Sequence, residues 1–308
     1  FNWKLFKHLL KRDIGILHAH DLWVLPGSVC AALFKKAPVV YDAHEFYRGL
    51  EIFNQKKLSG KIWALTEWLF IRFAKKILTI NASHGDLYKK IYPRISQPEV
   101  IMNLPERKGN AEASELPLFH DRKDSILFQG IFKPGRALPQ VIRAFAETDN
   151  GTLEFLGHGE IEQQLRQLTS DLGLGEKVYF FGKADWKDLC RRTQQAKAGV
   201  VLFEPTSINY KYASPNKFFE YVMAGTPLIA SDIPTFREFI SEHEVGILVN
   251  PDSGEEIISA IRKLLTNEKI WNKYHRNCLK AREIWNWEKQ EQKLLSVYRE
   301  LSGGLMPD

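Results

Sequence analysis

The stretch that begins at Ser214 combines the start of a helix with a cation and a carboxylate. Ser214 is a good N-cap residue and Pro215 suits the first helical position, so we expect a short helix that ends at Gly225. A helix start presents free N–H groups and a positive dipole end, which is a ready site for a phosphate or diphosphate. Lys217 adds a mobile cation there, and the Glu220 carboxylate, one turn further in, can accept hydrogen bonds from a ribose diol. The open alternative is an ordinary capped amphipathic helix.

A glycine-rich turn at residues 129–136 offers a second place for an anion. It follows an apolar stretch that we predict as a strand, and it reads Gln-Gly-Ile-Phe-Lys-Pro-Gly-Arg. Gly130 lets the backbone approach a diphosphate, and Lys133 and Arg136 can neutralise it. A turn with exposed charges is the alternative. The later turn at 157–160 reads Gly-His-Gly-Glu, and there we expect the glycines to serve the backbone conformation.

Histidines and carboxylates gather after two predicted strands of the first half. The sequences are His-Ala-His-Asp at 18–21 and Tyr-Asp-Ala-His-Glu at 41–45. The ends of parallel strands are where α/β proteins bind ligands. Histidines with Asp and Glu could also hold a metal, but these are spread over residues 18–45, and we expect no metal site. For each histidine, a satisfied strand-end side chain is the alternative.

Strands and helices alternate along the chain, which predicts a doubly wound α/β architecture. A length of 308 residues allows two domains, each with its own core. We expect a first domain at 1–104, a polar linker at 105–123, a second domain at 124–284 and a C-terminal helix at 285–308 that can cross back to the first domain. Strands are expected at 14–18, 38–42, 77–80 and 100–103 in the first domain and at 125–129, 152–156, 177–181, 199–203 and 226–230 in the second.

The composition is that of a soluble globular protein, with 44% hydrophobic and 26% charged residues. No stretch approaches the roughly 18 uninterrupted apolar residues of a membrane span. The three cysteines are few and widely spaced, which indicates a reducing compartment, no zinc site and ordinary buried thiols.

Positive charge is concentrated in the first domain. Residues 1–98 hold 16 Lys and Arg against 7 Asp and Glu, a net charge of +9, which leaves −3 for the rest of the chain. Basic residues are interspersed among the apolar residues of two helices predicted near 3–12 and 61–76. Such helices can lie on anionic lipid, and a solvated basic face over a core stripe is the alternative. No recognised nucleic-acid motif accompanies the charge, so we expect no nucleic-acid partner.

The pattern Ser-Pro-x-Lys-x-x-Glu-Tyr-x-x-Ala-Gly-x-Pro at 214–227 closely resembles the donor-site signature of the GT-B-fold retaining glycosyltransferases of family four, also called group 1 glycosyl transferases. The resemblance implies two Rossmann-like domains that face a cleft, with no metal and no cofactor. It also implies that Glu220, as the second Glu of an E-x7-E motif, binds the nucleotide ribose. Tyr212 stands where the first Glu of the motif should be. This departure affects how the sugar ring of the donor is held.

The same resemblance assigns residues to three roles. The expected catalytic residues are Arg136 and Lys217 on the leaving diphosphate and His44 pointing at the donor sugar. His20 and Asp21 are candidates for the acceptor side. Lys183 follows a strand near which the family reads the nucleotide base. The expected donor-binding residues are Gly130, Lys133, Lys183, Asn209, Tyr212, Ser214, Pro215, Asn216 and Glu220.

The function implied is transfer of a sugar from a nucleoside-diphosphate sugar, UDP- or GDP-linked, to a glycan or lipid-linked acceptor with retention of configuration. Two alternatives stay open: another GT-B enzyme, such as a sugar-nucleotide epimerase or a phosphorylase, and a non-catalytic member that binds nucleotide or membrane. The expected location is the cytoplasm, including the inner face of the membrane. The chain opens with Phe1 and a helix instead of a strand and a Gly-rich turn. We therefore expect the first domain to be incomplete, lacking a leading β-α-β stretch, and this chain to bind nucleotide while transferring little sugar.

Overall fold

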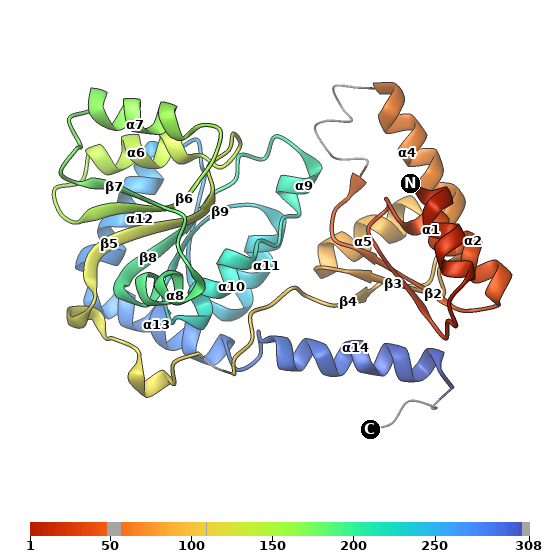
Figure 1. Cartoon of the computed structure of the whole chain (residues 1–308). Helices are drawn as coiled ribbons and strands as arrows, with labels where there is room; N and C mark the ends of the chain where they lie inside the picture. Colours follow the sequence, from red (N-terminus) through yellow and green to blue (C-terminus); the bar gives the residue numbers. More distant parts are fainter. Residues whose placement is uncertain (48–56, 109, 304–308) are drawn as a thin grey trace. The chain divides into compact units, whose positions relative to one another are not determined.

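Two compact units make up the chain in the computed structural model, which describes residues 1–47, 57–108 and 110–303 (Figure 1). Unit 1 consists of residues 1–103, 207–214 and 288–308, and unit 2 consists of residues 104–206 and 215–287. The segment 105–123, predicted as a linker, belongs to unit 2, and most of the segment 285–308 belongs to unit 1. Residues 109 and 304–308 of these two segments lie outside the described residues.

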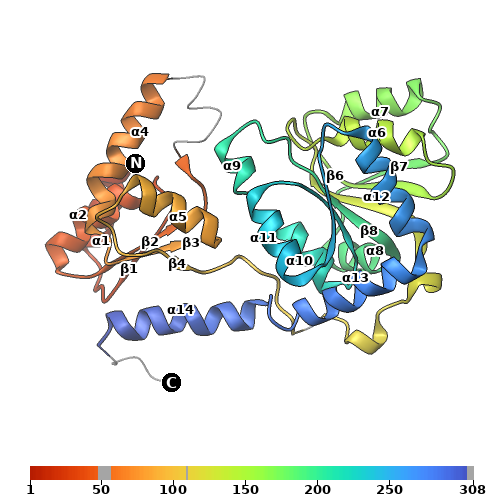
Figure 2. The ribbon, with the colours of Figure 1, turned by 180° about the vertical axis from the view of Figure 1, so that it is seen from behind.

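Unit 2 is built on a parallel sheet with the strand order β10-β9-β8-β5-β6-β7 (Figures 1 and 2). Counted along the chain, this is the 3-2-1-4-5-6 arrangement of doubly wound nucleotide-binding folds. The order reverses between β5 and β8, so the place where such sheets bind ligands lies at the C-terminal ends of these two strands. The strands are β5 (Lys123–Ile131), β6 (Thr152–His158), β7 (Val178–Gly182), β8 (Ala196–Val201), β9 (Leu228–Ser231) and β10 (Gly246–Val249).

The five strands predicted for this part of the chain all have counterparts, and β10 is one that the prediction omitted. Its sequence, Gly-Ile-Leu-Val, is too short to show a period. It pairs in parallel with β9. Gly246 permits this approach because a Cβ there would lie 2.2 Å from the carbonyl oxygen of Leu228.

Helices cover both faces of the unit 2 sheet, with α6, α7 and α12 on one face and α8, α10, α11 and α13 on the other (Figure 1). The core between sheet and helices buries Phe128 and Phe155 of the strands with Phe145 of α6 and Ile261 of α12. The helices are α6 (Leu138–Ala146), α7 (Glu162–Asp171), α8 (Trp186–Gln195), α10 (Asn216–Met223), α11 (Pro234–His243), α12 (Gly254–Thr266) and α13 (Glu268–Ala281), with short 3-10 helices at Ala113–Glu115 and Phe119–Asp121.

A buried arginine anchors the end of the predicted linker to unit 2. Arg122 is 4% exposed. Its guanidinium donates to the carbonyl oxygens of Ala196 and Ala224 and to the hydroxyl of Thr226, at 2.7 to 3.1 Å. Burial lowers the pKa of Arg122 to about 9. A segment that reads as polar and aperiodic is therefore tied to the core by hydrogen bonds, which hydrophobic patterning does not reveal.

Unit 1 is built on a smaller parallel sheet with the strand order β1-β2-β3-β4. The register of the first pair places His20 beside Asp42, and all five residues of β2 are buried. The strand predicted at 100–103 is wrong in extent, because only residues 99 and 100 pair with β3. The strands are β1 (Leu17–His20), β2 (Val39–Ala43), β3 (Lys76–Thr79) and β4 (Glu99–Val100).

A buried carboxylate joins the helices of unit 1 to this sheet. Glu67 of α4 is fully buried. It accepts hydrogen bonds from the hydroxyls of Tyr41 in β2, Tyr88 in α5 and Tyr92, at 3.0, 2.9 and 2.6 Å. These bonds hold α4 and α5 against the strand that carries Asp42. The helices are α1 (Asn2–Leu10), α2 (Leu25–Lys35), α4 (Lys57–Phe70), α5 (Ala82–Ile91), α9 (Ile208–Lys211) and α14 (Trp287–Leu301), with a 3-10 helix at Ile71–Phe73.

Two sequence-based expectations concern exposure. The expectation of three buried thiols is wrong, because Cys30 in α2 is exposed, Cys190 is half-buried and only Cys278 is buried. Within the described residues, no helix combines the length and the apolar character needed to cross a membrane.

Candidate active site

The turn that follows β5 lies at the switch point of the unit 2 sheet. Gly130 has a φ of +121°, a conformation that favours glycine. Two backbone hydrogen bonds hold the turn: Phe132 N–H donates to the His158 carbonyl at 2.8 Å, and Glu204 N–H, which follows β8, donates to the Gly135 carbonyl at 2.9 Å. The turn is therefore fixed by the end of β6 and by the loop that follows β8.

Two glycines of the next loop make room for this turn. A Cβ on Gly157 would lie 1.9 Å from the carbonyl oxygen of Gly130, and a Cβ on Gly159 would lie 2.0 Å from that of Phe132. No side chain fits between these backbones. The conformational role predicted for the Gly-x-Gly loop is confirmed.

Two cationic side chains converge on Gly130 from different elements. A Cβ on Gly130 would lie 3.7 Å from Lys217 Nζ and 3.8 Å from Arg136 Nη1. Arg136 comes from the turn just before α6, and Lys217 comes from the first turn of α10. Sequence separates these residues widely, and the switch point brings them together. An anion that approaches the Gly130 backbone meets both charges.

Lys217 is a fixed cation and not the mobile one that was predicted. Its side chain is 6% exposed, and Nζ lies 3.7 Å above the centre of the Phe128 ring. Nζ has no hydrogen-bond partner among the described residues. Burial and then the charge of Arg136 hold the pKa of Lys217 well below its usual range, and the Glu220 carboxylate opposes this only in part. The free protein thus keeps an unsatisfied ammonium at the place where an anion would fit.

Glu220 lies three residues after Lys217, on the same face of α10. Its carboxylate accepts a hydrogen bond from Gln129 Nε2, and Gln129 Oε1 accepts one from Thr193 Oγ1 at 2.9 Å. Burial raises the pKa of Glu220, against the opposing effects of Gln129 and Lys217. Glu220 also lines a small pocket with Trp186, Thr193 and other residues of unit 2. A polar ligand group that enters this pocket can therefore meet the Glu220 carboxylate.

The start of α10 differs from the prediction by one residue. The helix begins at Asn216, its N-cap is Pro215, and no side chain caps it. Pro215 has a ψ of 137°, which is extended and not helical. The Ser214 hydroxyl is buried and has no hydrogen-bond partner among the described residues, so its predicted role as N-cap is wrong.

The other donor-side residues of unit 2 vary in exposure. Lys133 is half-buried in the turn after β5, and its charge contributes to lowering the pKa of Lys217. Lys183 is exposed and directly follows Gly182, whose φ is +70°. Asn216 is exposed at the first position of α10.

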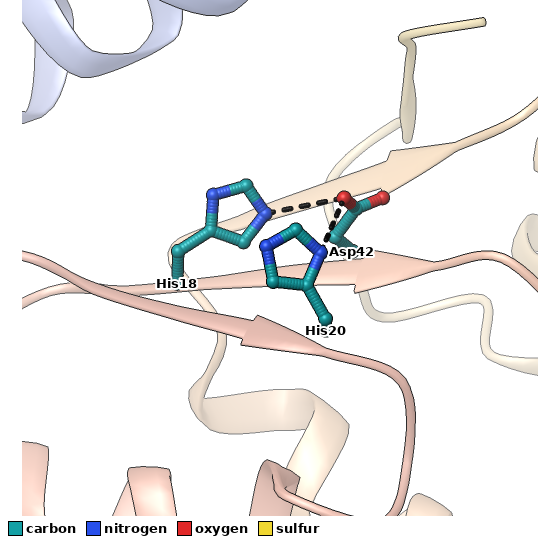
Figure 3. Close-up of side chains that lie close together, drawn as sticks. All are labelled: His18, His20 and Asp42. Carbon is teal, nitrogen blue, oxygen red and sulfur yellow. Dashed lines mark hydrogen bonds and ion pairs between the residues drawn. The ribbon is translucent and has the colours of Figure 1, made fainter. Parts of the chain in front are cut away.

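The second group of predicted residues belongs to unit 1 and surrounds Asp42. Asp42 Oδ2 lies 3.2 Å from His18 Nε2, 3.1 Å from His20 Nδ1 and 3.1 Å from His44 Nε2. Figure 3 shows His18 and His20 side by side, each with a ring nitrogen directed at this oxygen. The Asp21 carboxylate, from a residue with a φ of +63°, accepts a hydrogen bond from the His44 N–H at 3.1 Å.

The charges of this cluster are coupled. Burial disfavours ionisation of Asp42, but hydrogen bonds from His18 and His44 outweigh it and hold the pKa of Asp42 well below its usual range. The hydrogen bond to Asp42 raises the pKa of His44, whereas burial and the neighbouring His18 lower the pKa of His20. His44 therefore carries a proton to higher pH than an ordinary histidine, and His20 loses its proton earlier.

Residues 207–214 were assigned to the second domain, whereas the structure groups them with unit 1. Asn209 Oδ1 accepts a hydrogen bond from the Phe46 N–H at 3.1 Å, and the Tyr212 carbonyl accepts one from Asn81 Nδ2 at 3.0 Å. The predicted donor-side residues Asn209, Tyr212 and Ser214 are thus in the same unit as His44. Side-chain to backbone hydrogen bonds account for this grouping.

Four residues of these candidate sites received no role from the sequence. Phe128 and Gln129 contact Lys217 and Glu220, and His18 and Asp42 complete the histidine cluster. One signal was available for the second pair, since His18 and His20 have the i, i+2 spacing that places strand side chains on one face. No comparable signal marks Gln129.

Comparison with known proteins identifies relatives of this chain. The family model for glycosyl transferases group 1 matches residues 111–283. Phosphatidyl-myo-inositol mannosyltransferase of Mycobacterium leprae is 28% identical and aligns with 94% of this chain and 74% of that protein. Glycogen synthase of Mycobacterium tuberculosis is 24% identical over 81% of this chain and 60% of that protein.

Solved structures share the fold. Sucrose-phosphate synthase from Thermosynechococcus elongatus has a TM-score of 0.75 at 18% identity and covers 98% of this chain and 77% of its own. Anabaena Alr3699/HepE in complex with UDP-glucose has a TM-score of 0.77 at 16% identity and covers 97% of this chain and 82% of its own. The predicted α/β GT-B architecture is confirmed. Because the family model covers more than half of the chain, the protein belongs to the group 1 glycosyl transferases.

Proposed function

We propose that the protein transfers a sugar from a nucleoside-diphosphate sugar to an acceptor, with retention of configuration and without a metal. The observation that carries this proposal is the buried Lys217 ammonium beside Arg136 at the Gly130 turn. A bound diphosphate would place negative charge beside the Lys217 and Arg136 side chains. Relatives support the nucleotide class, since Anabaena Alr3699/HepE was solved with UDP-glucose.

The chemistry follows from where charge develops. When the sugar leaves, negative charge grows on the β-phosphate, and Arg136, Lys217 and the start of α10 stabilise it. These groups are held in place before the reaction, so no reorganisation is needed at the transition state. Two cations of the chain take the part that a divalent metal has in other transferases. The leaving phosphate then helps to remove the proton of the acceptor, which attacks from the same face.

Glu220 is proposed to bind the ribose of the nucleotide. Its carboxylate is oriented by Gln129, which is itself fixed by Thr193, so one carboxylate face is set before binding. On the unit 1 side, His44 is proposed to contact the donor sugar, with Asp42 fixing its ring through Nε2. His20 and Asp21 stay proposed acceptor-side residues, and Asn209 and Tyr212 stay proposed contacts of the donor sugar.

The acceptor is proposed to be a glycan or a lipid-linked glycan at an anionic membrane surface. Unit 1 exposes apolar side chains on α4, including Ile62, Leu65 and Trp68. Arg72 stacks over the Trp68 ring at 4.1 Å. Aromatic rings paired with cations are typical of helices that lie in the headgroup region of a membrane. The net charge of +9 over residues 1–98 would attract unit 1 to an anionic membrane surface.

Replacing Glu220 with alanine should weaken UDP or GDP binding by about 1–3 kcal/mol, the usual loss for a hydrogen bond to a charged group. Isothermal titration calorimetry on the folded variant measures this loss. Glu160→Ala, which removes an exposed carboxylate from the 157–160 loop, is the matched control and should bind normally. Unchanged affinity in the Glu220 variant would remove this residue from the site.

Replacing Arg136 with alanine should lower kcat more than it raises the Michaelis constant, because the charge that Arg136 meets grows in the transition state. The assay follows nucleotide release from UDP-, GDP- and ADP-sugars, and NMR of the product gives its anomeric configuration. Arg143→Ala, which removes an exposed arginine of α6, is the matched control.

An inverted product would contradict retention in this assay. Nucleotide binding without turnover by any of these donors would favour the non-catalytic alternative. A change in the Michaelis constant alone would make Arg136 a ground-state anchor of the donor.

The double substitution Ile62→Glu and Trp68→Glu should abolish sedimentation with anionic phosphatidylglycerol vesicles, because it places charge where the helix would meet lipid. The unsubstituted protein should sediment with these vesicles and not with neutral phosphatidylcholine ones. Ile284→Glu, at an exposed apolar residue of unit 2, is the control. Equal sedimentation of the double variant would exclude α4 as the membrane contact.

A further inference from the structure

Three imidazoles surround one carboxylate oxygen at the C-terminal edge of the unit 1 sheet. His18 and His20 lie on one face of β1 because residues two apart in a strand share a face. The parallel register sets His20 directly beside Asp42 of β2. His44 follows two residues later and also reaches Oδ2. The register of the two paired strands therefore determines where the residues of this cluster lie.

Hydrogen bonding does not fully account for this arrangement. One carboxylate oxygen offers about two lone-pair directions, and three imidazole nitrogens lie within 3.2 Å of Asp42 Oδ2. The rings of His18 and His20 are stacked, with centroids 4.2 Å apart and an angle of 10° between them. Both present a nitrogen to the same small volume, and in the tautomers that leave these nitrogens unprotonated their lone pairs would face one common partner.

The spacing of these donor atoms fits a tetrahedral metal ion. The ligand atoms of His18, His20 and Asp42 all lie within 4.8 Å of one another. The two nitrogen-to-oxygen distances, 3.2 and 3.1 Å, are close to the about 3.3 Å that separates neighbouring ligands on a tetrahedral zinc ion. Asp42 is buried, whereas the His20 side chain is 63% exposed, so one side of the cluster is open to solvent.

A contact outside the cluster orients one of the ligands. His18 Nδ1 is hydrogen-bonded to the hydroxyl of Tyr298 on α14, which leaves Nε2 facing Asp42. Ligand histidines commonly hold their ring in this way through the second nitrogen. The two-histidine, one-carboxylate donor set selects divalent transition metals, because Mg²⁺ and Ca²⁺ prefer oxygen ligands alone.

We propose that unit 1 binds a zinc ion through His18 Nε2, His20 Nδ1 and Asp42 Oδ2, with a fourth position open to solvent. This goes beyond the proposed transfer reaction, and it replaces the sequence-based expectation of no metal in this segment. All three ligands belong to unit 1, whereas the cations assigned to the diphosphate belong to unit 2. Zinc binding and binding of the diphosphate are therefore separate claims.

The test is calorimetric titration of the full chain with zinc chloride and, in parallel, with magnesium chloride. We expect one zinc ion per chain, and affinity for magnesium at least about tenfold weaker. His20→Ala should weaken zinc binding by at least about tenfold, the scale of losses seen even for groups that only support a metal ligand. Because His20 is largely exposed, this variant should fold normally, which circular dichroism checks.

His120→Ala is the matched control. His120 is an exposed histidine that lies 3.2 Å from the Glu268 carboxylate, and within the described residues it belongs to no group of three possible metal ligands, so its loss should leave zinc binding unchanged. Cobalt(II) gives an independent readout, since a tetrahedral site produces intense visible absorption that should disappear in His20→Ala.

Zinc affinity no greater than that for magnesium, or equal zinc binding by the His20 variant, would overturn the proposal and leave a hydrogen-bonded cluster. Neither result bears on UDP affinity, so failure here is distinguishable from failure of the proposed function.

Discussion

The burial of one ammonium group is the constraint on which unit 2 depends. Lys217 is enclosed against the Phe128 ring without a hydrogen-bond partner among the described residues, although charged side chains are seldom buried unless they are paired. The free-energy cost of burying this ammonium appears as a lowered pKa of Lys217, which is caused by burial and by the charge of Arg136. A protein retains such a group where an anion completes the charge balance. The Gly130 turn, the paired glycines of the next loop and the start of α10 all frame that position.

Both units place their chemistry by the same structural rule. In unit 2, the switch point between β5 and β8 brings together cations that lie far apart in sequence. In unit 1, the register of β1 and β2 sets histidines around Asp42. The electrostatics are opposite: unit 2 holds unsatisfied positive charge, and unit 1 holds a carboxylate stabilised by imidazoles. Anions suit the first site and cations suit the second.

Sequence patterns predicted the fold and the segments that form the candidate site, but not the burial and contacts of their side chains. The alternation of apolar runs with helical patterns gave the parallel sheets, and the motif at 214–227 located α10. The burial of Lys217 was not predictable, because a lysine in a helix reads as exposed and only the packing of Phe128 beneath it decides otherwise. Arg122 was missed for a similar reason, since its hydrogen bonds to Ala196 and Thr226 depend on tertiary contacts. The three-fold approach to Asp42 required the strand register, which no local pattern specifies.

Proton uptake on nucleotide binding tests the central claim most directly. Calorimetry of UDP binding is run at a series of pH values from about 7 to 10, where a terminal phosphate with a pKa of about 6 is already ionised, and each titration is repeated in buffers of different ionisation enthalpy. A diphosphate beside Lys217 favours its charged form and raises its depressed pKa, so binding should take up protons. Lys217→Gln should abolish this uptake. Uptake that persists in the variant, or that is absent from the unsubstituted protein at every pH of the series, would contradict the account of a buried cation awaiting a diphosphate.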